Sequence, residues 1–104
     1  MKVKITVPIT DMDGTAIKSG DKDLTLRETF CNSLMNAPDS QTIDGAEKCK
    51  RYDLAVRIHR HSKGEIDLNL EEVTLLKDLV GKTYFPIVVG QVWSILDPAP
   101  DEQT

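Results

Sequence analysis

The sequence is poor in the residues that build disulfide frameworks, redox centres and membrane spans. Only two of its 104 residues are cysteine, and they do not form a Cys-x-x-Cys motif, so neither a disulfide scaffold nor a dithiol centre is predicted. The longest stretch without a charged side chain covers residues 83–96, whereas crossing a bilayer takes about 20 apolar residues. The six glycines are isolated from one another, which argues against a glycine-rich phosphate loop.

The remaining composition is that of one globular domain. Hydrophobic residues make up 39% of the chain and charged residues 29%, a balance typical of folded, soluble proteins rather than disordered ones. A chain of 104 residues holds one hydrophobic core. We therefore expect a single α+β domain over residues 1–97, followed by a flexible acidic tail over residues 98–104.

The first residues of the chain have the pattern of a strand. Apolar and polar side chains alternate over residues 2–10, with Val3, Ile5, Val7 and Ile9 on the face that we expect to be buried. Asp11-Met12-Asp13-Gly14 has the composition of a tight turn, and residues 15–18 follow as a returning arm. The sequence therefore predicts an N-terminal β-hairpin, with a short third strand at residues 65–68.

Four further segments have helical spacing, and together they predict a cluster of about four helices beside the hairpin. Three begin with a capping residue that is followed three positions later by Glu, a signature of a helix start. These run from Thr25 to about residue 36, from Asp44 to about residue 62, and from Asn69 to Val80, where Gly81 is expected to end the helix. The segment 86–96 opens with proline, which suits a first helical turn, but its β-branched residues suit a strand equally well.

The aromatic residues on these segments fall among apolar neighbours. Phe30, Tyr52 and Trp93 are therefore expected in the core, and the fluorescence of Trp93 is expected to be blue-shifted. The apolar residues of the second helix spread widely around its axis, which indicates a central helix.

The net charge of −4 conceals a strongly basic segment. Residues 48–63 carry six Lys or Arg and one Asp, a net charge of +5, so the rest of the chain carries −9. Lys50, Arg57 and His61 fall on one helical stripe with Arg60 beside it. This candidate binding face suits an acidic protein surface, including another copy of the chain. Nucleic acid is the alternative partner, but the acidic remainder and the scarcity of aromatics favour a protein.

One motif points to catalysis. Asp11-Met12-Asp13-Gly14-Thr15, after an apolar strand, resembles the first motif of haloacid dehalogenase-type phosphatases. The resemblance implies that Asp11 is the phosphorylated nucleophile and Asp13 the general acid/base, with magnesium between them. That family also needs further parallel strands, whereas after residue 20 this chain offers mostly helices. A plain turn is the favoured interpretation, and we predict neither an enzyme nor a small-molecule substrate.

The sequence also predicts no cofactor or metal. His59 and His61 are two residues apart, which on a helix points them to different faces. Cys49 lies ten residues before His59, and no carboxylate spacing completes a tetrahedral site.

Three short stretches carry a second resemblance. Residues 47–55, 70–73 and 88–93 are similar to small uncharacterised proteins encoded by tailed bacteriophages and prophages. The resemblance implies a protein of the host cytoplasm or the virion that acts through contacts, in particle assembly or on a host factor, and it brings no catalytic residues. We therefore expect a non-enzymatic interaction protein that self-associates or binds a phage or host protein.

Overall fold

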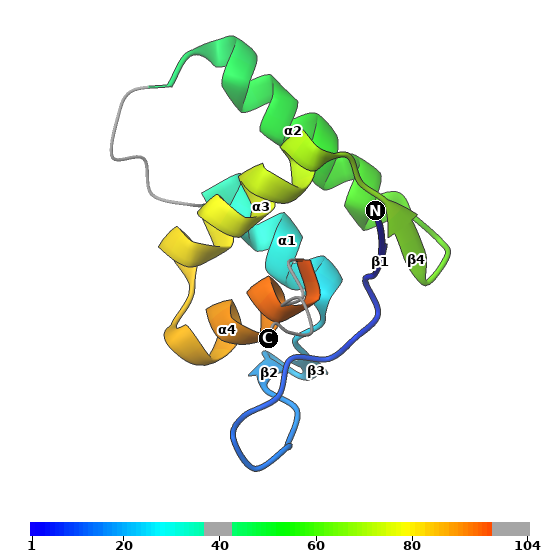
Figure 1. Cartoon of the computed structure of the whole chain (residues 1–104), viewed down its shortest axis with the longest axis vertical. Helices are drawn as coiled ribbons and strands as arrows, with labels where there is room; N and C mark the ends of the chain where they lie inside the picture. The colour runs from blue at the N-terminus through cyan, green and yellow to red at the C-terminus, as the bar shows by residue number, and fades with distance from the viewer. Residues whose placement is uncertain (37–42, 97–104) are drawn as a thin grey trace, which may run out of the picture.

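The computed structural model describes residues 1–36 and 43–96, which form an α+β domain as predicted (Figure 1). In chain order the elements are β1 (Lys2–Lys4), β2 (Lys18–Ser19), β3 (Lys22–Asp23), α1 (Leu26–Asn36), α2 (Gly45–Arg60), β4 (Glu65–Asp67), α3 (Leu70–Thr83) and α4 (Pro86–Leu96). The tail expected at residues 98–104 lies outside the described residues. No helix in the described ranges is long and apolar enough to span a membrane.

The helices begin where the capping residues predict. The side chain of Asp44 accepts the backbone N–H of Glu47 at 2.8 Å, and that of Asn69 accepts the N–H of Glu72 at 2.8 Å. Glu72 also reaches back to the N–H of Asn69 at 2.9 Å, which completes a capping box. These contacts satisfy amide groups that have no partner within the helix, so local sequence alone defines each start.

The helical state of residues 86–96 and the C-terminal end of α3 depend on packing against other parts of the chain. Residues 86–96 are helical, because Val88, Val92 and Leu96 are buried along one side of α4. Gly81 does not end the third helix, which continues to Thr83. The ring of Trp93 of α4 lies 3.7 Å from the position that a Cβ atom on Gly81 would occupy, so this glycine lies at the edge of the contact between α3 and α4.

The core forms where α1 packs against α2 and α3, and α3 against α4. The N-terminal segment adds its alternate apolar side chains to this core, as predicted, although Val7 is only half-buried. The buried apolar residues are Val3, Ile5, Ile9, Leu24, Leu26, Phe30, Leu34, Leu54, Ala55, Ile58, Ile66, Leu68, Val73, Leu76, Leu79, Val80, Val88, Val92 and Leu96.

The strands are shorter than the alternation predicts, and they pair differently from a simple hairpin. β1 pairs antiparallel with β4, with Val3 opposite Ile66. Beyond β1, the N-terminal segment hydrogen-bonds to the chain just before α1, where the N–H of Leu26 donates to Val7 and that of Ile9 to Leu24. Only one bridge, Thr10 to Ala16, joins the two arms around the predicted turn. Pro8 has no N–H to donate, which limits a longer ladder here.

Two of the three aromatic residues assigned to the core lie on the surface. Phe30 is fully buried, but Tyr52 is 55% exposed and Trp93 is 42% exposed. The reason is that helical spacing identifies an apolar stripe without showing how much of it a neighbouring element covers. On α2 only Leu54, Ala55 and Ile58 are buried, so α2 is a peripheral helix and not the central one.

The surroundings of Trp93 give a spectroscopic prediction. Its indole N–H donates to the carbonyl oxygen of Lys77 at 3.1 Å, and the Lys77 ammonium group lies 4.9 Å from the ring centroid. Because the ring is partly exposed, we expect its fluorescence to be quenched readily by acrylamide. A strongly blue-shifted emission that acrylamide does not quench would contradict this position of the ring.

Candidate interaction surface on helix α2

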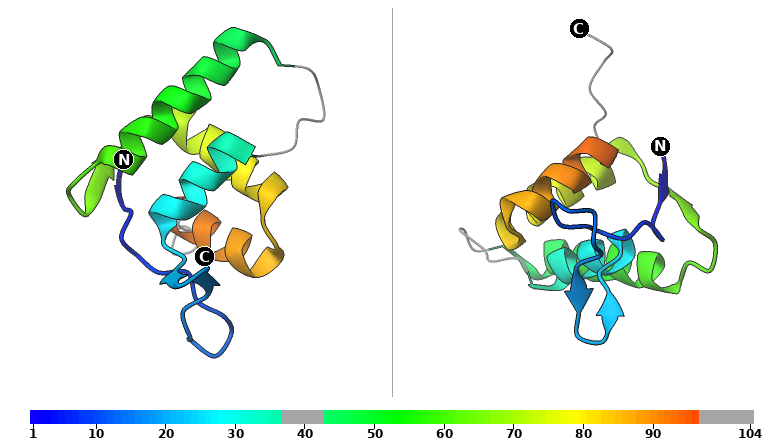
Figure 2. Two further views of the ribbon diagram at one scale, coloured as in Figure 1. Left: turned by 180° about the vertical axis from the view of Figure 1, so that it is seen from behind. Right: turned by 90° about the horizontal axis from the view of Figure 1, so that it is seen from below.

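Helix α2 is held at its C-terminal half and projects at its N-terminal half. Figures 1 and 2 show its first turns extending beyond the other helices. Its buried residues, Leu54, Ala55 and Ile58, all lie in the second half. The projecting half is supported by the Asp44 cap and by an ion pair at 3.4 Å between Arg51 and Glu47. Most of the basic segment predicted from the sequence therefore lies on a helix that packs against the rest of the protein along one side only.

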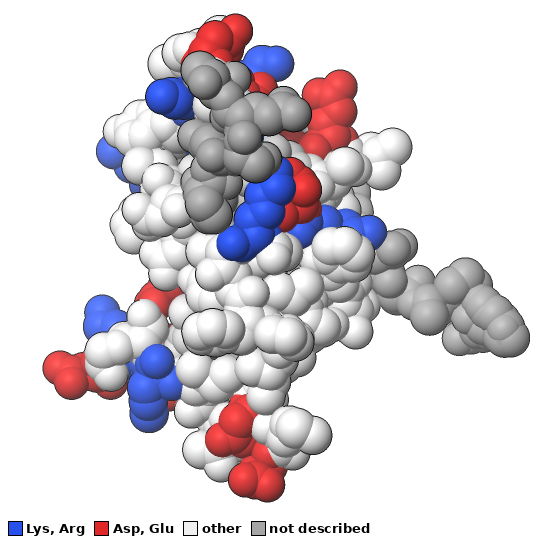
Figure 3. Space-filling model, turned by 90° about the vertical axis from the view of Figure 1, so that its left-hand side faces the viewer, with Lys and Arg blue, Asp and Glu red and all other residues white. Residues whose placement is uncertain are grey.

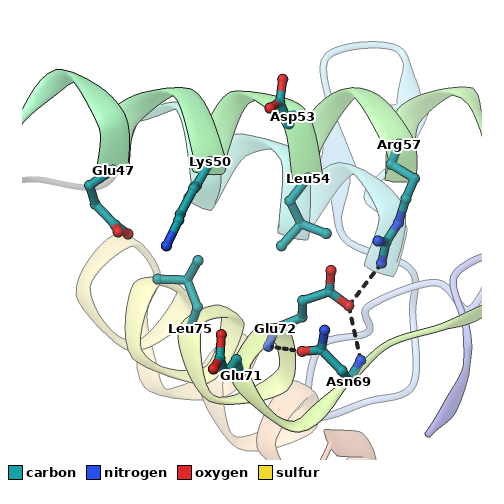
Figure 4. A pocket seen from close by; sticks show the side chains of 9 residues that line it. All are labelled: Glu47, Lys50, Asp53, Leu54, Arg57, Asn69, Glu71, Glu72 and Leu75. Carbon is teal, nitrogen blue, oxygen red and sulfur yellow. Dashed lines mark hydrogen bonds and ion pairs between the residues drawn. The ribbon is translucent and has the colours of Figure 1, made fainter.

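The side of α2 that faces α3 forms a groove of about 430 Å³ (Figure 4). Leu54 and Leu75 contribute its apolar surface, and Lys50 points into it from α2. The polar lining is mostly acidic, consisting of Glu47, Asp53, Glu71, Glu72, Asn69, Lys50 and Arg57. Four carboxylates against two cations make this groove unfavourable for a phosphate.

Arg57 is engaged within the protein on the same side. Its guanidinium group donates to the Glu72 carboxylate at 2.9 Å and to the carbonyl oxygen of Asp67 at 3.4 Å. Glu72 thus joins α2 to the start of α3, because the same carboxylate also closes the Asn69 capping box. Partial burial acts to raise the pKa of Glu72, but the hydrogen bonds from Arg57 and Asn69 outweigh it and hold that pKa below its ordinary value.

This lowered pKa predicts a specific loss of stability in acid. Since the folded state lowers the pKa of Glu72, its contribution is present above the unfolded-state pKa and is lost as the pH falls through the folded-state pKa. Glu72→Gln should retain the capping hydrogen bond while removing this acid-range dependence. Glu72→Ala should lose the cap too, at a further cost of about 1 kcal/mol.

Urea unfolding of both variants between neutral and acidic pH measures the two effects separately. An unchanged acid-range slope in Glu72→Gln would contradict the link between Arg57 and Glu72.

A second row of residues along α2 does not line the groove and is largely exposed. Lys48, Tyr52, Val56 and Arg60 follow one another at four-residue steps, with Cys49 beside Tyr52. We call these five residues the outer stripe. Tyr52 is 55% exposed, Cys49 and Arg60 are exposed, and Val56 is half-buried. Neither Lys48 nor Arg60 forms an ion pair with any residue that the structure describes. The stripe is therefore apolar in its middle and cationic at both ends.

The four predicted binding residues do not share one surface. Lys50 and Arg57 face the groove, and Arg60 lies on the outer stripe. His61 forms the C-terminal cap of α2, where its ring meets the carbonyl oxygen of Glu65 and its own carbonyl accepts from Arg27 at 2.7 Å. Through these internal contacts His61 joins α1, the end of α2 and the start of β4.

The sequence predicts that Tyr52, in the middle of the outer stripe, lies in the core. A signal was nevertheless present, because Cys49, Tyr52 and Val56 form an apolar row on the opposite side of the helix from Leu54 and Ile58. A helix with two apolar sides needs two neighbours, and in the described structure α2 packs extensively only on α1.

The aspartate-rich loop is built as a turn. The Asp11 carboxylate accepts the backbone N–H groups of Asp13 at 2.9 Å and Thr15 at 3.0 Å, and Gly14 has a φ of 86°. The flanking arms meet through an antiparallel bridge, whereas the phosphatase motif follows a strand of a parallel sheet. Among residues 1–36 and 43–96, no three His, Cys, Asp or Glu side chains gather closely enough to hold a metal ion.

Comparisons of the chain with protein-family models, with curated proteins and with solved structures give no match. The function proposed below therefore rests on the chemistry and geometry of the described residues.

Proposed function

We propose that the chain is a non-enzymatic interaction protein that binds another protein through the outer stripe of α2. The observation that carries this proposal is the exposure of Tyr52 between the cations Lys48 and Arg60, neither of which forms an ion pair within residues 1–36 and 43–96. An aromatic side chain with a polar tip is among the residues most enriched at protein interfaces, because it buries a large area at little entropic cost. Val56 and Cys49 extend the apolar area on either side of it.

The chemistry of the stripe specifies the kind of partner that fits. Its apolar middle favours an apolar side chain, and its cationic ends favour carboxylates on both sides of that side chain. A protein surface that places an apolar residue between acidic residues satisfies both requirements. On the resemblance to bacteriophage proteins, such a contact would serve particle assembly or capture of a host factor, in the host cytoplasm or on the virion.

Nucleic acid is the second candidate partner. The exposed cations Lys48, Lys50 and Arg60, which have no ion pair among the described residues, favour it because lysine and arginine side chains bind phosphates. Against it, carboxylates dominate the groove beside Lys50, and the outer stripe has an apolar centre. Phosphatase activity at Asp11 is the least supported proposal, because one oxygen of that carboxylate already accepts two backbone N–H groups.

A nuclear magnetic resonance titration tests the proposal residue by residue. The labelled protein is titrated with a short amphipathic peptide that carries leucine on one face and glutamate on the other. We expect shift changes to concentrate at the outer stripe and to weaken with added salt. Tyr52→Ser should abolish them, while Leu70→Ser, which changes another exposed apolar side chain (81% exposed), should leave them intact.

A DNA duplex titrated in parallel at low and moderate salt distinguishes the two partners. Tight, salt-sensitive binding of the duplex without binding of the peptide would overturn the proposal in favour of nucleic acid. Absence of shift changes with either probe would overturn both.

A further inference from the structure

The loop between β1 and β2 presents an apolar side chain to solvent. Met12 is 95% exposed, the largest exposure among the bulky apolar residues of the described chain. It lies between Asp11 and Asp13, which are both exposed. The turn that displays it is well defined, because Asp11 accepts two backbone N–H groups within it and donates its own N–H to the carbonyl of Thr15 at 2.9 Å. We call Asp11, Met12 and Asp13 the acidic tip.

The acidic tip has the chemistry that the outer stripe requires. It places one flexible apolar side chain between two carboxylates, and the outer stripe places Tyr52 and Val56 between two cations. Lys48 and Arg60 are separated by about 18 Å along the helix axis, which leaves room for the tip between them. Methionine adapts well to such an apolar surface, since its side chain is unbranched and polarisable.

The two surfaces lie far apart in the molecule. In Figure 1 the loop that carries the acidic tip protrudes at the bottom, whereas α2 descends from the top of the view toward β1 and β4 at the right, well above that loop. Figure 3 shows acidic side chains at this lowest point of the molecule, where Figure 1 places the loop. Because of this separation, one copy of the chain cannot join its own tip to its own stripe. Any contact between them must therefore form between copies.

We propose that the acidic tip of one copy docks on the outer stripe of the next, with Met12 packed against Tyr52 and Val56 and the two carboxylates facing Lys48 and Arg60. This inference rests on the proposed function and names a second copy as the partner. A contact between different surfaces of identical chains is heterologous, so it propagates head to tail. A three-residue tip buries far less than the roughly 1,600 Å² of a standard interface, so the association is weak and sensitive to salt.

A mixing experiment tests this arrangement. The tip variant combines Met12→Ser with Asp13→Asn, and the stripe variant combines Tyr52→Ser with Arg60→Glu; all four side chains are exposed, and circular dichroism checks folding. By sedimentation at high concentration, the wild-type mass should rise beyond that of a dimer. Each variant alone should remain monomeric. An equimolar mixture should stop at the dimer, because it contains one intact tip and one intact stripe.

Phe85→Ser serves as the matched control, since Phe85 is 78% exposed and lies outside both surfaces, and it should associate like the wild type. A monomeric wild type at high concentration, a tip variant that still associates, or a mixture without dimer would each overturn the inference. If the acidic amphipathic peptide still binds the outer stripe in that case, the proposed function stands and only the identity of the partner is wrong.

Discussion

Phe30→Ala is expected to lower the free energy of unfolding by about 3–5 kcal/mol, whereas Tyr52→Ala should change it by no more than about 0.5 kcal/mol. The two aromatic residues have similar surroundings in the sequence, but Phe30 is fully buried and Tyr52 is 55% exposed. Removing the Phe30 ring leaves a cavity among packed side chains, and the lost contacts are not replaced. Removing the Tyr52 ring exposes little that was covered.

Urea unfolding of both variants measures the difference. Small domains are stable by only about 5–15 kcal/mol, so Phe30→Leu provides a milder variant if the alanine protein does not fold. Equal losses at the two positions would contradict the burial of Phe30 on α1 and the exposure of Tyr52 on α2. Such a result would also remove the basis for proposing Tyr52 as a binding residue.

Reversing both terminal charges of the outer stripe is expected to weaken binding of the acidic amphipathic peptide at least tenfold, which corresponds to about 1.4 kcal/mol. The change is Lys48→Glu with Arg60→Glu. It replaces two exposed cations by anions that repel the carboxylates of the peptide. Folding should be preserved, because both residues are exposed.

Lys50→Glu is the matched control on the same helix. Lys50 faces the groove lined mainly by carboxylates, away from the outer stripe, so its reversal should change the affinity less than twofold. Isothermal titration calorimetry at low and moderate salt measures the affinity of the peptide for the wild type, for the double variant and for Lys50→Glu. A larger effect at Lys50 than at Lys48 and Arg60 would place the binding surface in the groove instead.

Local features of the fold were predictable from the sequence. The starts of α2 and α3 follow from Asp44 and Asn69, because a cap involves only residues within one turn. The buried face of α1 follows from the four-residue spacing of Leu26, Phe30 and Leu34. Each of these features depends on contacts that are short in sequence.

Features that depend on distant contacts were not predictable. β1 pairs with β4 across about 60 residues of chain, and Arg57 finds Glu72 on another helix. The candidate site is of this kind, because the exposure of Tyr52 depends on which side of α2 the neighbouring helix covers. The basic composition of α2 was visible in the sequence, but the placement of its cations, some in an acidic groove and others on the outer stripe, was not.

The two cysteines offer a direct test of the outer stripe. Cys49 belongs to the stripe and is exposed, whereas Cys31 on α1 is half-buried and donates to the carbonyl of Ala55 at 3.5 Å. Burial raises the pKa of the Cys31 thiol; the charge of Arg27 opposes this rise and that of Glu28 adds to it. Because the thiolate is the reactive form, Cys31 should react slowly and serve as an internal reference.

The decisive measurement is the rate of alkylation of each cysteine by N-ethylmaleimide, read by mass spectrometry, with and without a saturating amount of the acidic amphipathic peptide. If the partner binds on the outer stripe, the alkylation rate of Cys49 should fall at least tenfold while that of Cys31 stays the same. An unchanged rate at Cys49 under saturation would contradict the account.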